Sequence, residues 1–535
     1  MEWNLADLFE SVVDVLPDHE ILVGGGRRLT YAQLEDRANR LAHHLAEHGV
    51  GPGDFVGTYL YNCTEYLEAT LAAYKLRAIP VNVNYRYVED ELRYLFDNAD
   101  LVALVHGREF TGRIAAVQAD CPELRHFVAV EDGSDADLRA IGAVEYETAI
   151  AAASPARDFG PRSGDDLYVL YTGGTTGLPK GVLWRQEDFY LATIAPLVAL
   201  GGAPPDRPED VAELARNGGV VSLIVPPLMH GAAMWVALMA FYAGGKAVLC
   251  ESHRLDADEV WSLVGRERVQ SIVTVGDAMV RPLIEALDAP GADYDLSSLI
   301  AIGSGGALLS SAVKEQIRTR LPNVLIIDSL GASESGYQGS VVGEDAAGHP
   351  RFRMGPSTTV LGPDHRPVEA GTGIVGYLAR GGHVPLGYYK DEAKTKATFV
   401  EADGKRWAVP GDMAVLEADG TITLLGRGSV SINSGGEKIY PEEVEAALKR
   451  HPDVFDAVVV GVPDERWGER VAAVVVPRAG RTPTLESLVE TARQHIAGYK
   501  LPRELHLVPE MVRSPSGKAD YRWAKTTALS PPAAE

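Results

Sequence analysis

Patterns of amphipathic helix alternate with short apolar runs through the first half of the chain, and this alternation constrains the fold most strongly. Residues 29–48 place apolar side chains on one helical face, and glycines separate them from an apolar run at 55–60. A second helical pattern at 64–76 leads to another apolar run at 78–83. Strand, helix and strand in this order predict a right-handed βαβ unit, and therefore a sheet that is at least partly parallel. Further strands are predicted at residues 101–105, 220–225, 247–249, 271–275, 299–302 and 324–327.

The pattern changes after Gly426, and the segment 426–430 is our candidate linker. The chain of 535 residues is too long for one ordinary core. We predict an α/β protein with a large N-terminal domain, residues 1–428, of mixed and partly parallel sheets with flanking helices, followed by a small C-terminal α+β domain, residues 429–535. The cleft between two such domains is a common place for ligands. The small domain is expected to contain helices at 444–449 and 485–496 and strands at 454–462, 471–477 and 504–508.

Composition argues against several classes of function. The 50 Lys and Arg residues against 74 Asp and Glu give a formal net charge of −24, which disfavours sequence-blind binding to nucleic acid or to an anionic membrane. The three cysteines are far apart, so neither a zinc knuckle nor a disulfide framework is indicated. The first residues do not resemble a signal peptide, and no uncharged apolar run reaches the roughly 18 residues of a membrane span. We therefore expect a cytoplasmic protein with no stable membrane insertion.

A loop rich in glycine and threonine, residues 171–181, is the strongest local signal for chemistry. Its glycines let the backbone turn tightly and point N–H groups inward, while threonine hydroxyls and the Lys180 ammonium add donors that suit a polyphosphate. It is not a Walker A loop, because Lys180 is followed by Gly181 and not by Ser or Thr. A Gly/Thr-rich hairpin turn is the structural alternative. The candidate phosphate-binding residues are Thr172, Gly173, Gly174, Thr175, Thr176 and Lys180.

Residues 171–181 resemble the phosphate loop of the adenylate-forming superfamily, which includes acyl-CoA synthetases, luciferases and the adenylation domains of peptide synthetases. Seven stretches resemble the family's motifs in the family's order, and the resemblance extends from about Leu29 to Arg522. Besides the loop these are residues 227–231 beside the acyl pocket, 303–307 beside adenine, 328–334 with a metal-binding glutamate, 407–412 with 426–427 at the ribose, 435–445 at the start of the C-terminal domain, and 513–518 with the catalytic lysine.

The resemblance implies an ATP-dependent ligase that joins an acid to a thiol. An acid does not react with a thiol near pH 7, because hydroxide is a poor leaving group; adenylation by ATP supplies pyrophosphate and then AMP in its place. In the family's pattern Lys518 neutralises charge on the phosphate oxygens, Glu334 and Thr176 hold Mg²⁺, and His230 gates the carboxylate. The structural alternatives are a solvated turn lysine, a surface acid, and a core or turn histidine. ATP, Mg²⁺ and coenzyme A are the implied cofactors.

The resemblance also assigns contacts to the nucleotide and to CoA. Asp412 accepts from both ribose hydroxyls, although an aspartate after Gly411 also suits a turn or a helix cap. Arg427 belongs to the same ribose motif, or is an exposed linker charge. The other candidates are Gly305, Gly306, Ala307, Asp328, Ser329, Leu330 and Ser333 for the nucleotide, and Gly435, Gly436 and Lys438 on the C-terminal domain.

Small residues dominate the stretches that resemble the walls of the acyl pocket. Small side chains in the lining of a pocket leave space for a large substrate. A bulky hydrophobic acid is therefore plausible: a fatty, steroid side-chain or other polycyclic terpenoid acid. Apolar pockets discriminate weakly among similar hydrocarbons, so the sequence does not name the acid. Small residues are also required for close backbone packing, which is the alternative. The candidate residues are His230, Gly231, Val275, Gly276, Asp277, Gly303, Ser304, Gly305 and Gly331.

The resemblance further implies that the C-terminal domain is mobile and serves two steps. A rotation about the linker, with Ser429 at the pivot, brings the Lys518 loop to the site for adenylation and then the loop 435–436 for thioester formation.

Three residues depart from the general pattern of the superfamily. Leu330 stands where an aromatic residue commonly stacks on adenine, Pro410 replaces a threonine, and Ser429 replaces Asp or Lys. The local strings 171–185, 276–279 and 426–445 are most similar to actinobacterial acyl-CoA synthetases that act on steroid side-chain acids. We interpret the departures as traits of that subgroup.

Three other functions fit the same motifs. The first is an enzyme that performs only the adenylation half-reaction, or one that loads a carrier protein. A carrier-loading enzyme would need carrier protein in place of CoA to form a thioester. A luciferase-like oxidoreductase would take up oxygen, and a non-catalytic binding protein would fail to exchange pyrophosphate with ATP. The expected partners are a small carboxylic acid, ATP and CoA, without nucleic acid, and a homodimer is left open.

Overall fold

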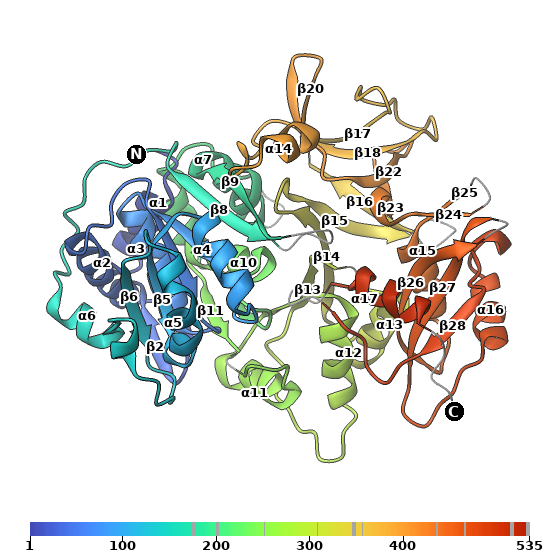
Figure 1. Cartoon of the computed structure of the whole chain (residues 1–535), viewed down its shortest axis with the longest axis horizontal. Coiled ribbons are helices and arrows are strands. Elements are labelled where there is room, and N and C mark those ends of the chain that lie inside the picture. The colour runs from blue at the N-terminus through green and yellow to red at the C-terminus, as the bar shows by residue number, and fades with distance from the viewer. Residues whose placement is uncertain are drawn as a thin grey trace. The chain divides into compact units, whose positions relative to one another are not determined.

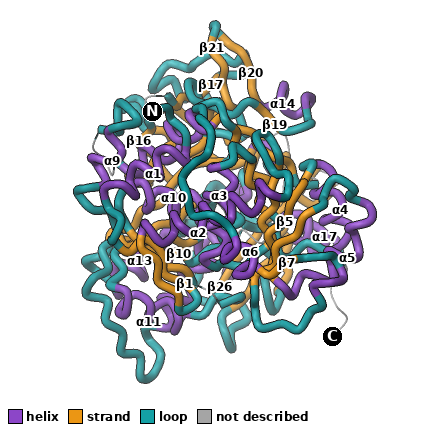
Figure 2. Tube along the Cα trace, turned by 90° about the vertical axis from the view of Figure 1, so that its left-hand side faces the viewer, coloured by secondary structure: helices purple, strands orange, loops and turns teal. Residues whose placement is uncertain are grey.

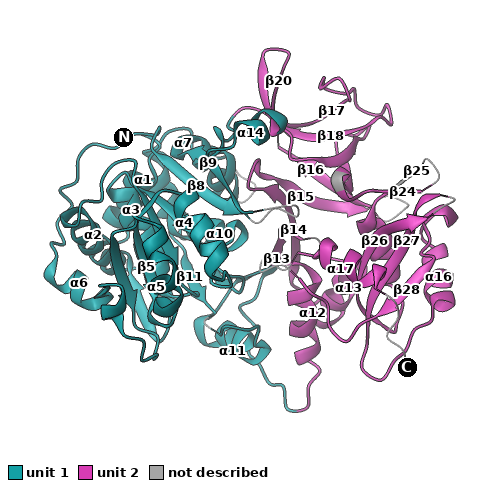
Figure 3. Cartoon of the chain, viewed as in Figure 1, with its two compact units in different colours: residues 1–274, 291–302, 383–397 teal, residues 275–290, 303–382, 398–535 magenta. Residues whose placement is uncertain are grey.

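The computed structural model of the chain contains two compact units (Figures 1 and 3). Unit 1 is formed by residues 1–274, 291–302 and 383–397, and unit 2 by residues 275–290, 303–382 and 398–535. The predicted domain division between residues 428 and 429 stays a prediction. The structure describes residues 1–172, 178–199, 203–250, 252–307, 309–344, 349–355, 357–434, 437–464, 467–513 and 518–530.

Unit 1 contains the predicted βαβ unit within a five-stranded parallel sheet, ordered β4-β3-β5-β6-β7. Strands β3 (Phe55–Tyr59) and β4 (Ile79–Asn82) are joined by α3 (Thr64–Lys75), a helix in which every residue is buried. The predicted α/β class with a partly parallel sheet is therefore confirmed. The remaining strands are β5 (Leu101–Gly107), β6 (His126–Val130) and β7 (Val144–Glu145).

The predicted first helix is α2 (Tyr31–Glu47), which packs against α3 and α6 (Tyr146–Ala152) in unit 1 (Figure 2). Its start is a capping box: the Thr30 hydroxyl accepts from the Gln33 backbone N–H, and the Gln33 side chain accepts from the Thr30 N–H. The local sequence therefore fixes where this helix begins.

A second group of strands in unit 1 is ordered β2-β1-β11-β10-β12 and is parallel except for the β1–β2 hairpin. The predicted strands at 220–225, 247–249 and 271–275 correspond to β10, β11 and β12. Helix α10 (Gly231–Tyr242) packs against β10 and β11. The strands are β1 (Glu20–Gly24), β2 (Arg27–Thr30), β10 (Val221–Ile224), β11 (Lys246–Leu249) and β12 (Ser271–Thr274).

Unit 2 contains a run of antiparallel strands that the sequence did not predict, apart from the start of β14. The reason is visible in β14 itself, where exposed and half-buried residues predominate, and in glycine-rich β15. Neither strand has the continuous apolar run on which the prediction relied. In spatial order the strands are β14 (Leu325–Ala332), β15 (Gly336–Glu344), β16 (Pro350–Met354), β23 (Ile422–Arg427), β22 (Asp412–Leu416) and β18 (Val375–Arg380).

The last hundred residues of unit 2 are built on two long antiparallel strands, β26 (Val454–Asp464) and β27 (Gly468–Pro477), as predicted. Alternate side chains of β26 point to opposite faces, and both faces are buried. One face carries α15 (Pro441–Leu448) and α16 (Leu485–Arg493), and the other carries α17 (Tyr521–Leu529). Helix α17 was not predicted. Within the described ranges, no helix has the length and hydropathy needed to cross a bilayer.

Candidate active site

The glycine- and threonine-rich loop connects two strands of a hairpin in unit 1. Strands β8 (Leu167–Thr172) and β9 (Lys180–Arg185) are antiparallel, with Thr172 opposite Lys180. The Lys180 ammonium forms an ion pair with Asp391, with 2.5 Å between Nζ and Oδ2. The hairpin that we considered as the structural alternative is thus present, and it is compatible with phosphate binding at its tip. The predicted contacts of Gly173, Gly174, Thr175 and Thr176 lie outside the described residues.

Asn82, the last residue of β4, ties this hairpin to the predicted acyl motif. Its side-chain amide donates to the carbonyl oxygens of Tyr171, at 2.7 Å, and Met229, at 2.8 Å. Its Oδ1 accepts from the Tyr171 N–H at 2.7 Å. One side chain therefore holds the backbone of the hairpin, at Tyr171, and the backbone of the predicted acyl motif, at Met229. We did not identify Asn82 from the sequence; its only signal is a polar residue at the end of an apolar strand.

A second asparagine holds the acyl motif from the other end. The Asn62 amide donates to the Pro226 carbonyl at 3.1 Å, and its Oδ1 accepts from the Leu228 N–H at 2.7 Å. His230 follows as the N-cap residue of α10, without a capping bond from its side chain. A Cβ on Gly231 would lie 3.1 Å from the side chains of Leu170 and Trp235. Glycine therefore allows close packing there, which was the alternative to a role in pocket volume.

The predicted catalytic lysine lies in a charged cluster of unit 2. Glu334, Asp412 and Arg427 all act electrostatically on the Lys518 ammonium group. A Cβ built on Gly306 would lie 3.7 Å from Lys518 Cε, so the lysine also approaches the predicted adenine-side loop. Although Lys518 keeps an exposed surface, desolvation of its ammonium and then the Arg427 charge lower its pKa, and the two carboxylates partly offset this. The structure thus brings together residues that are far apart in the sequence.

The ribose pair, Asp412 and Arg427, occupies facing positions on β22 and β23. Arg427 Nε lies 3.3 Å from Asp412 Oδ1. The Arg427 N–H donates to Glu442 Oε1 at 3.4 Å, and burial, followed by the charge of Glu445, raises the pKa of Glu442 to about 8. Gly426 has φ of +117°, and a Cβ there would lie 2.4 Å from Glu442 Oε2. A Cβ at position 426 would therefore clash with Glu442 where that side chain now lies, and glycine before Arg427 avoids this clash.

Two predicted nucleotide residues are engaged with the protein. The buried Asp328 carboxylate forms an ion pair with Lys314 at 3.0 Å and accepts from the Leu309 N–H at 3.2 Å. Burial raises the pKa of Asp328 to about 6, with Lys314 opposing the rise. Leu330 packs against an apolar cluster that contains Val360, Leu378, Ala414 and Ile422. These contacts explain why the motif is rigid, and the roles of both residues toward ATP stay predictions.

Two stretches predicted to line the acyl pocket meet in unit 2. The Gly276 N–H, at the start of α12 (Gly276–Ala286), donates to Ser304 Oγ at 2.9 Å, and that hydroxyl donates to the Ala307 carbonyl at 2.8 Å. Val275 precedes this helix as its buried N-cap residue. Asp277 is buried and accepts from the Ser310 N–H at 2.8 Å. The stretches are thereby held as one structure.

The other predicted residues are distributed as follows. A bulge of β14 falls between Leu330 and Gly331, and a Cβ on Gly331 would lie 2.6 Å from the Gly336 carbonyl oxygen. Gly435 and Gly436, and the side chains of Ser429 and Lys438, lie outside the described residues. In β13 (Ala301–Gly305), β14 and the turn after it lie Gly303, Gly305, Ser329 and Ser333.

The donor groups of the unit 2 cluster fit a magnesium nucleotide. Lys518 and Arg427 offer cations to phosphate oxygens, and Asp412 offers an acceptor to hydroxyl groups. Glu334 offers a carboxylate oxygen, the ligand type that Mg²⁺ prefers, while phosphate and water fill its remaining positions. Cations and carboxylates in one place are the electrostatic arrangement that binding of a magnesium nucleotide needs.

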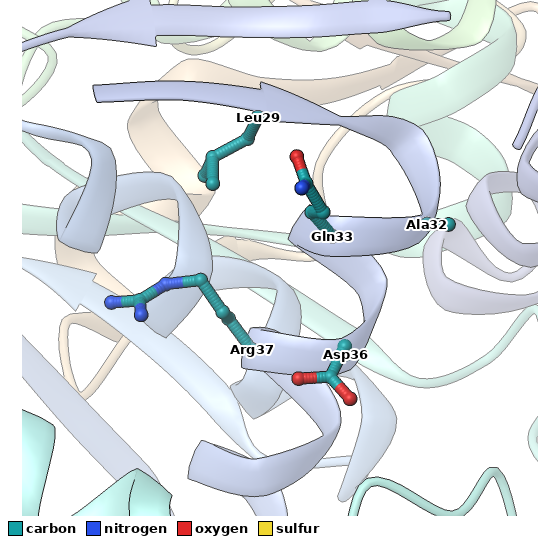
Figure 4. Close-up of a pocket in the computed structure, with 5 residues that line it drawn as sticks. All are labelled: Leu29, Ala32, Gln33, Asp36 and Arg37. Atoms are coloured by element: carbon teal, nitrogen blue, oxygen red, sulfur yellow. The ribbon is translucent and has the colours of Figure 1, made fainter. Parts of the chain in front are cut away.

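A surface pocket elsewhere in unit 1 contributes nothing to this site. It is lined by Leu29, Ala32, Gln33, Asp36 and Arg37 at the start of α2 (Figure 4). Arg37 is paired with the carboxylates of Glu68 and Glu147. None of the predicted site residues lines it.

Comparison with known proteins agrees with this geometry. Residues 9–389 match the family described as AMP-binding enzyme, and residues 443–518 match the AMP-binding enzyme C-terminal domain. A 3-oxocholest-4-en-26-oate–CoA ligase of Rhodococcus rhodochrous is 52% identical over 540 residues, which cover 99% of this chain and 97% of that protein. A medium/long-chain-fatty-acid–CoA/3-oxocholest-4-en-26-oate–CoA ligase of Mycobacterium tuberculosis is also 52% identical, over 99% of this chain and 97% of that protein.

Solved structures share the fold at lower sequence identity. The anthranilate CoA ligase AuaEII in complex with anthranoyl-AMP superposes with a TM-score of 0.83 at 22% identity, covering 98% of this chain and 97% of that one. ATP-bound MatB from Rhodopseudomonas palustris has a TM-score of 0.81 at 23% identity, covering 98% and 99%. With the charged cluster around Lys518 and the family match over most of its length, the chain belongs to the AMP-binding enzyme family.

Proposed function

We propose that this protein is an ATP-dependent acid–CoA ligase that adenylates a bulky hydrophobic carboxylic acid and passes the acyl group to coenzyme A, releasing pyrophosphate and AMP. The observation that carries the proposal is the gathering of Lys518, Glu334, Asp412 and Arg427 in one cluster. A surface lysine in a solvated turn would have no reason to lie among these groups.

The residues of the cluster have separate tasks in the first half-reaction. As the carboxylate attacks the α-phosphorus and the bond to pyrophosphate breaks, negative charge grows on the phosphate oxygens, and Lys518 is the cation that meets it. Asp412 holds the ribose hydroxyls, and Arg427 orients Asp412 from the facing strand. Bound Mg²⁺, which Glu334 would hold, supplies charge neutralisation on the polyphosphate.

The acid class follows from the relatives. Two relatives that are each 52% identical over 99% of this chain are named for 3-oxocholest-4-en-26-oate, and one of them also for medium- and long-chain fatty acids. The glycines of the predicted pocket stretches do not add support, because a Cβ at Gly231 or Gly331 would meet neighbouring atoms at 3.1 Å or 2.6 Å. We assign the steroid side-chain acid as the first substrate to test and fatty acids as the second.

We further propose that residues 429–535 move as a body between the two half-reactions, with the pivot at Ser429. Asp456, on β26, pairs with Lys449 at 3.3 Å and with Arg513 at 2.5 Å, so these groups stay together when the body moves. Lys449 also lies 4.0 Å from Asp277 on α12, outside that body. A charged pair of this second kind would be exchanged for water when the body turns, which supports the proposal.

The test is a product assay with and without CoA. The purified protein is incubated with ATP, Mg²⁺ and 3-oxocholest-4-en-26-oate, or with medium- and long-chain fatty, aryl and diterpenoid acids, and AMP and acyl-CoA are followed by mass spectrometry. We expect acyl-CoA from the steroid acid. Accumulation of acyl-AMP without thioester would instead indicate a carrier-dependent enzyme. Absence of AMP and of pyrophosphate exchange with every acid would overturn the enzymatic proposal.

A further inference from the structure

Three histidines that have no part in the proposed ligase chemistry gather in unit 1. His44 lies in the last turn of α2, His48 is the residue that caps its C-terminus, and His126 begins β6. One ring nitrogen from each of them lies within 4.8 Å of the other two. Within the described residues, this is the one group of three or more His, Cys, Asp and Glu side chains with that spacing.

The fold explains why the rings meet. Residues four apart on a helix lie one above the other, so His44 and His48 share a face at the end of α2. The start of β6 brings the third ring to that face, with His44 Nε2 and His126 Nε2 only 3.0 Å apart. His44 and His126 are buried, and His48 is exposed. The protein therefore encloses the rings of His44 and His126, whereas the ring of His48 is open to solvent.

The hydrogen bond of His48 leaves a lone pair on its other ring nitrogen. His48 Nδ1 donates to the His44 carbonyl at 2.8 Å, which fixes the proton on Nδ1 and leaves Nε2 as an acceptor. A backbone carbonyl on the second ring nitrogen is the partner that metal-ligating histidines commonly have. Two facing Nε2 atoms can share one proton or one metal ion.

We propose that His44, His48 and His126 bind one Zn²⁺ ion through ring nitrogens, with water at the open position, and that the ion ties the end of α2 to the start of β6. Tetrahedral Zn²⁺ with bonds of 2.0–2.1 Å places its ligand atoms about 3.4 Å apart. The separation of His44 and His126 is close to this value. The exposed ring of His48 stacks on His126 with centroids 4.0 Å apart, which brings its ring nitrogen within 4.8 Å of the other two ligand atoms.

The charges around the cluster favour a cation. The cluster lies at the C-terminus of α2, where the helix dipole is negative, and the carboxylate of Glu47 acts on His44. Imidazole nitrogens suit Zn²⁺ and also Cu²⁺ and Ni²⁺, and they do not suit Mg²⁺. The site is therefore distinct in chemistry from the carboxylate that we assign to the nucleotide's magnesium.

The test is a titration of metal-free, tag-free protein with Zn²⁺ in the absence of ATP. The variant is His48→Gln, because His48 is exposed and its replacement leaves the buried rings in place. The matched control is His43→Gln, since His43 lies on the same helix but bonds to the Ala156 carbonyl and Asp158. Glu334→Gln controls for Zn²⁺ at the magnesium position. The same proteins are loaded with Co²⁺ and their visible absorption is recorded.

We expect one Zn²⁺ per chain in the wild type and in both control variants, and at least tenfold weaker binding in His48→Gln. The d–d absorption of Co²⁺ should be lost with it, and Zn²⁺ should raise the Tm of the wild type but not of His48→Gln. Equal affinity in His48→Gln and the wild type would overturn the proposal. So would loss of the bound Zn²⁺ in Glu334→Gln with His48→Gln unaffected.

Discussion

The predicted site residues of unit 1 and those of unit 2 are each held, within their own unit, by a different kind of bond. In unit 1 two asparagine side chains hold the backbone of the hairpin and of the acyl motif through neutral hydrogen bonds. In unit 2 the same task falls to charged groups: Lys518, Arg427, Asp412 and the pairs of Asp456. Neutral bonds make a fixed frame, whereas charged groups respond to substrate charge, pH and movement. The comparison therefore separates the part of the site that positions from the part that reacts.

Replacement of Lys518 by Ala tests the reacting part and should have the largest effect. We expect adenylation to fall by about 10²–10³-fold, the loss typical for one group that stabilises transition-state charge. Conversion of a supplied acyl-adenylate to acyl-CoA should persist, because we propose that the lysine loop serves the first half-reaction. Pyrophosphate exchange and single-turnover thioester formation measure the two steps.

The matched control is Lys525→Ala, since Lys525 is an exposed lysine of α17 that pairs only weakly with Glu469, at 3.5 Å. It should leave both rates within twofold of the wild type. An equal loss in both half-reactions for Lys518→Ala would contradict the division of tasks.

Replacement of Asn82 by Ala tests the positioning part. It leaves the carbonyls of Tyr171 and Met229 and the Tyr171 N–H without their partner, at about 1–3 kcal/mol for each group that stays buried and unsatisfied. We expect a lower Tm and at least tenfold lower kcat/KM for both ATP and the acid. Asn84→Ala, which removes local bonds to the Arg86 N–H and the Tyr87 side chain, is the control. A change in one substrate's kcat/KM alone would show that Asn82 does not join the two motifs.

Replacement of Asp456 by Asn should have a smaller and selective effect. It weakens the pairs with Lys449 and Arg513 that hold the lysine loop, so adenylation should slow by about three- to tenfold while thioester formation is unchanged. Asp453→Asn is the matched control, because Asp453 pairs with Arg481 at 3.5 Å outside this network. Slowing of the thioester step alone would contradict this prediction, because the pairs of Asp456 lie within the C-terminal body and turn with it.

The buried carboxyl of Glu442 should make part of the stability of unit 2 depend on pH. Its pKa is about 8 in the folded protein, against an ordinary value of 4.5, so the unfolded chain releases its proton first. Stability therefore falls as pH rises between these values, and Glu442→Gln should remove that fall. From pH 5 to pH 8 the variant should gain at least about 1.4 kcal/mol over the wild type, the equivalent of one pKa unit. Denaturant unfolding at both pH values measures this, with Glu486→Gln on α16 as the control. A constant difference would mean that Glu442 is ionised in the fold.

The sequence predicted those parts of the molecule that depend on local periodicity or on a contiguous motif. The βαβ unit was predictable because two short apolar runs flank a helical pattern. The antiparallel strands of unit 2 were not, because their side chains are only partly buried and their order in the sheet depends on long-range pairing. Lys518, Glu334 and Asp412 were assigned from motifs, and the structure brings them together.

Residues that act by position escaped the sequence analysis. Asn82 looks like a polar residue in an apolar strand, Glu442 like one more acid of a charged helix, and His126 like a lone histidine in a strand. Their roles depend on partners 89 and 15 positions away for Asn82 and Glu442, and 82 positions away for His126. No spacing rule links such partners, so only the folded chain reveals them.

The hydrogen bonds of Asn82 also limit how the substrate range of this enzyme can change during evolution. Because one amide holds both the Met229 and Tyr171 carbonyls, a change that shifts the backbone of the acyl motif is transmitted to the strand that leads into the phosphate loop. We therefore expect that a backbone change that alters selectivity for the acid also alters the binding of ATP. Variation that only exchanges side chains, and leaves these carbonyls in place, is the route by which such a chain can broaden its substrates without losing turnover.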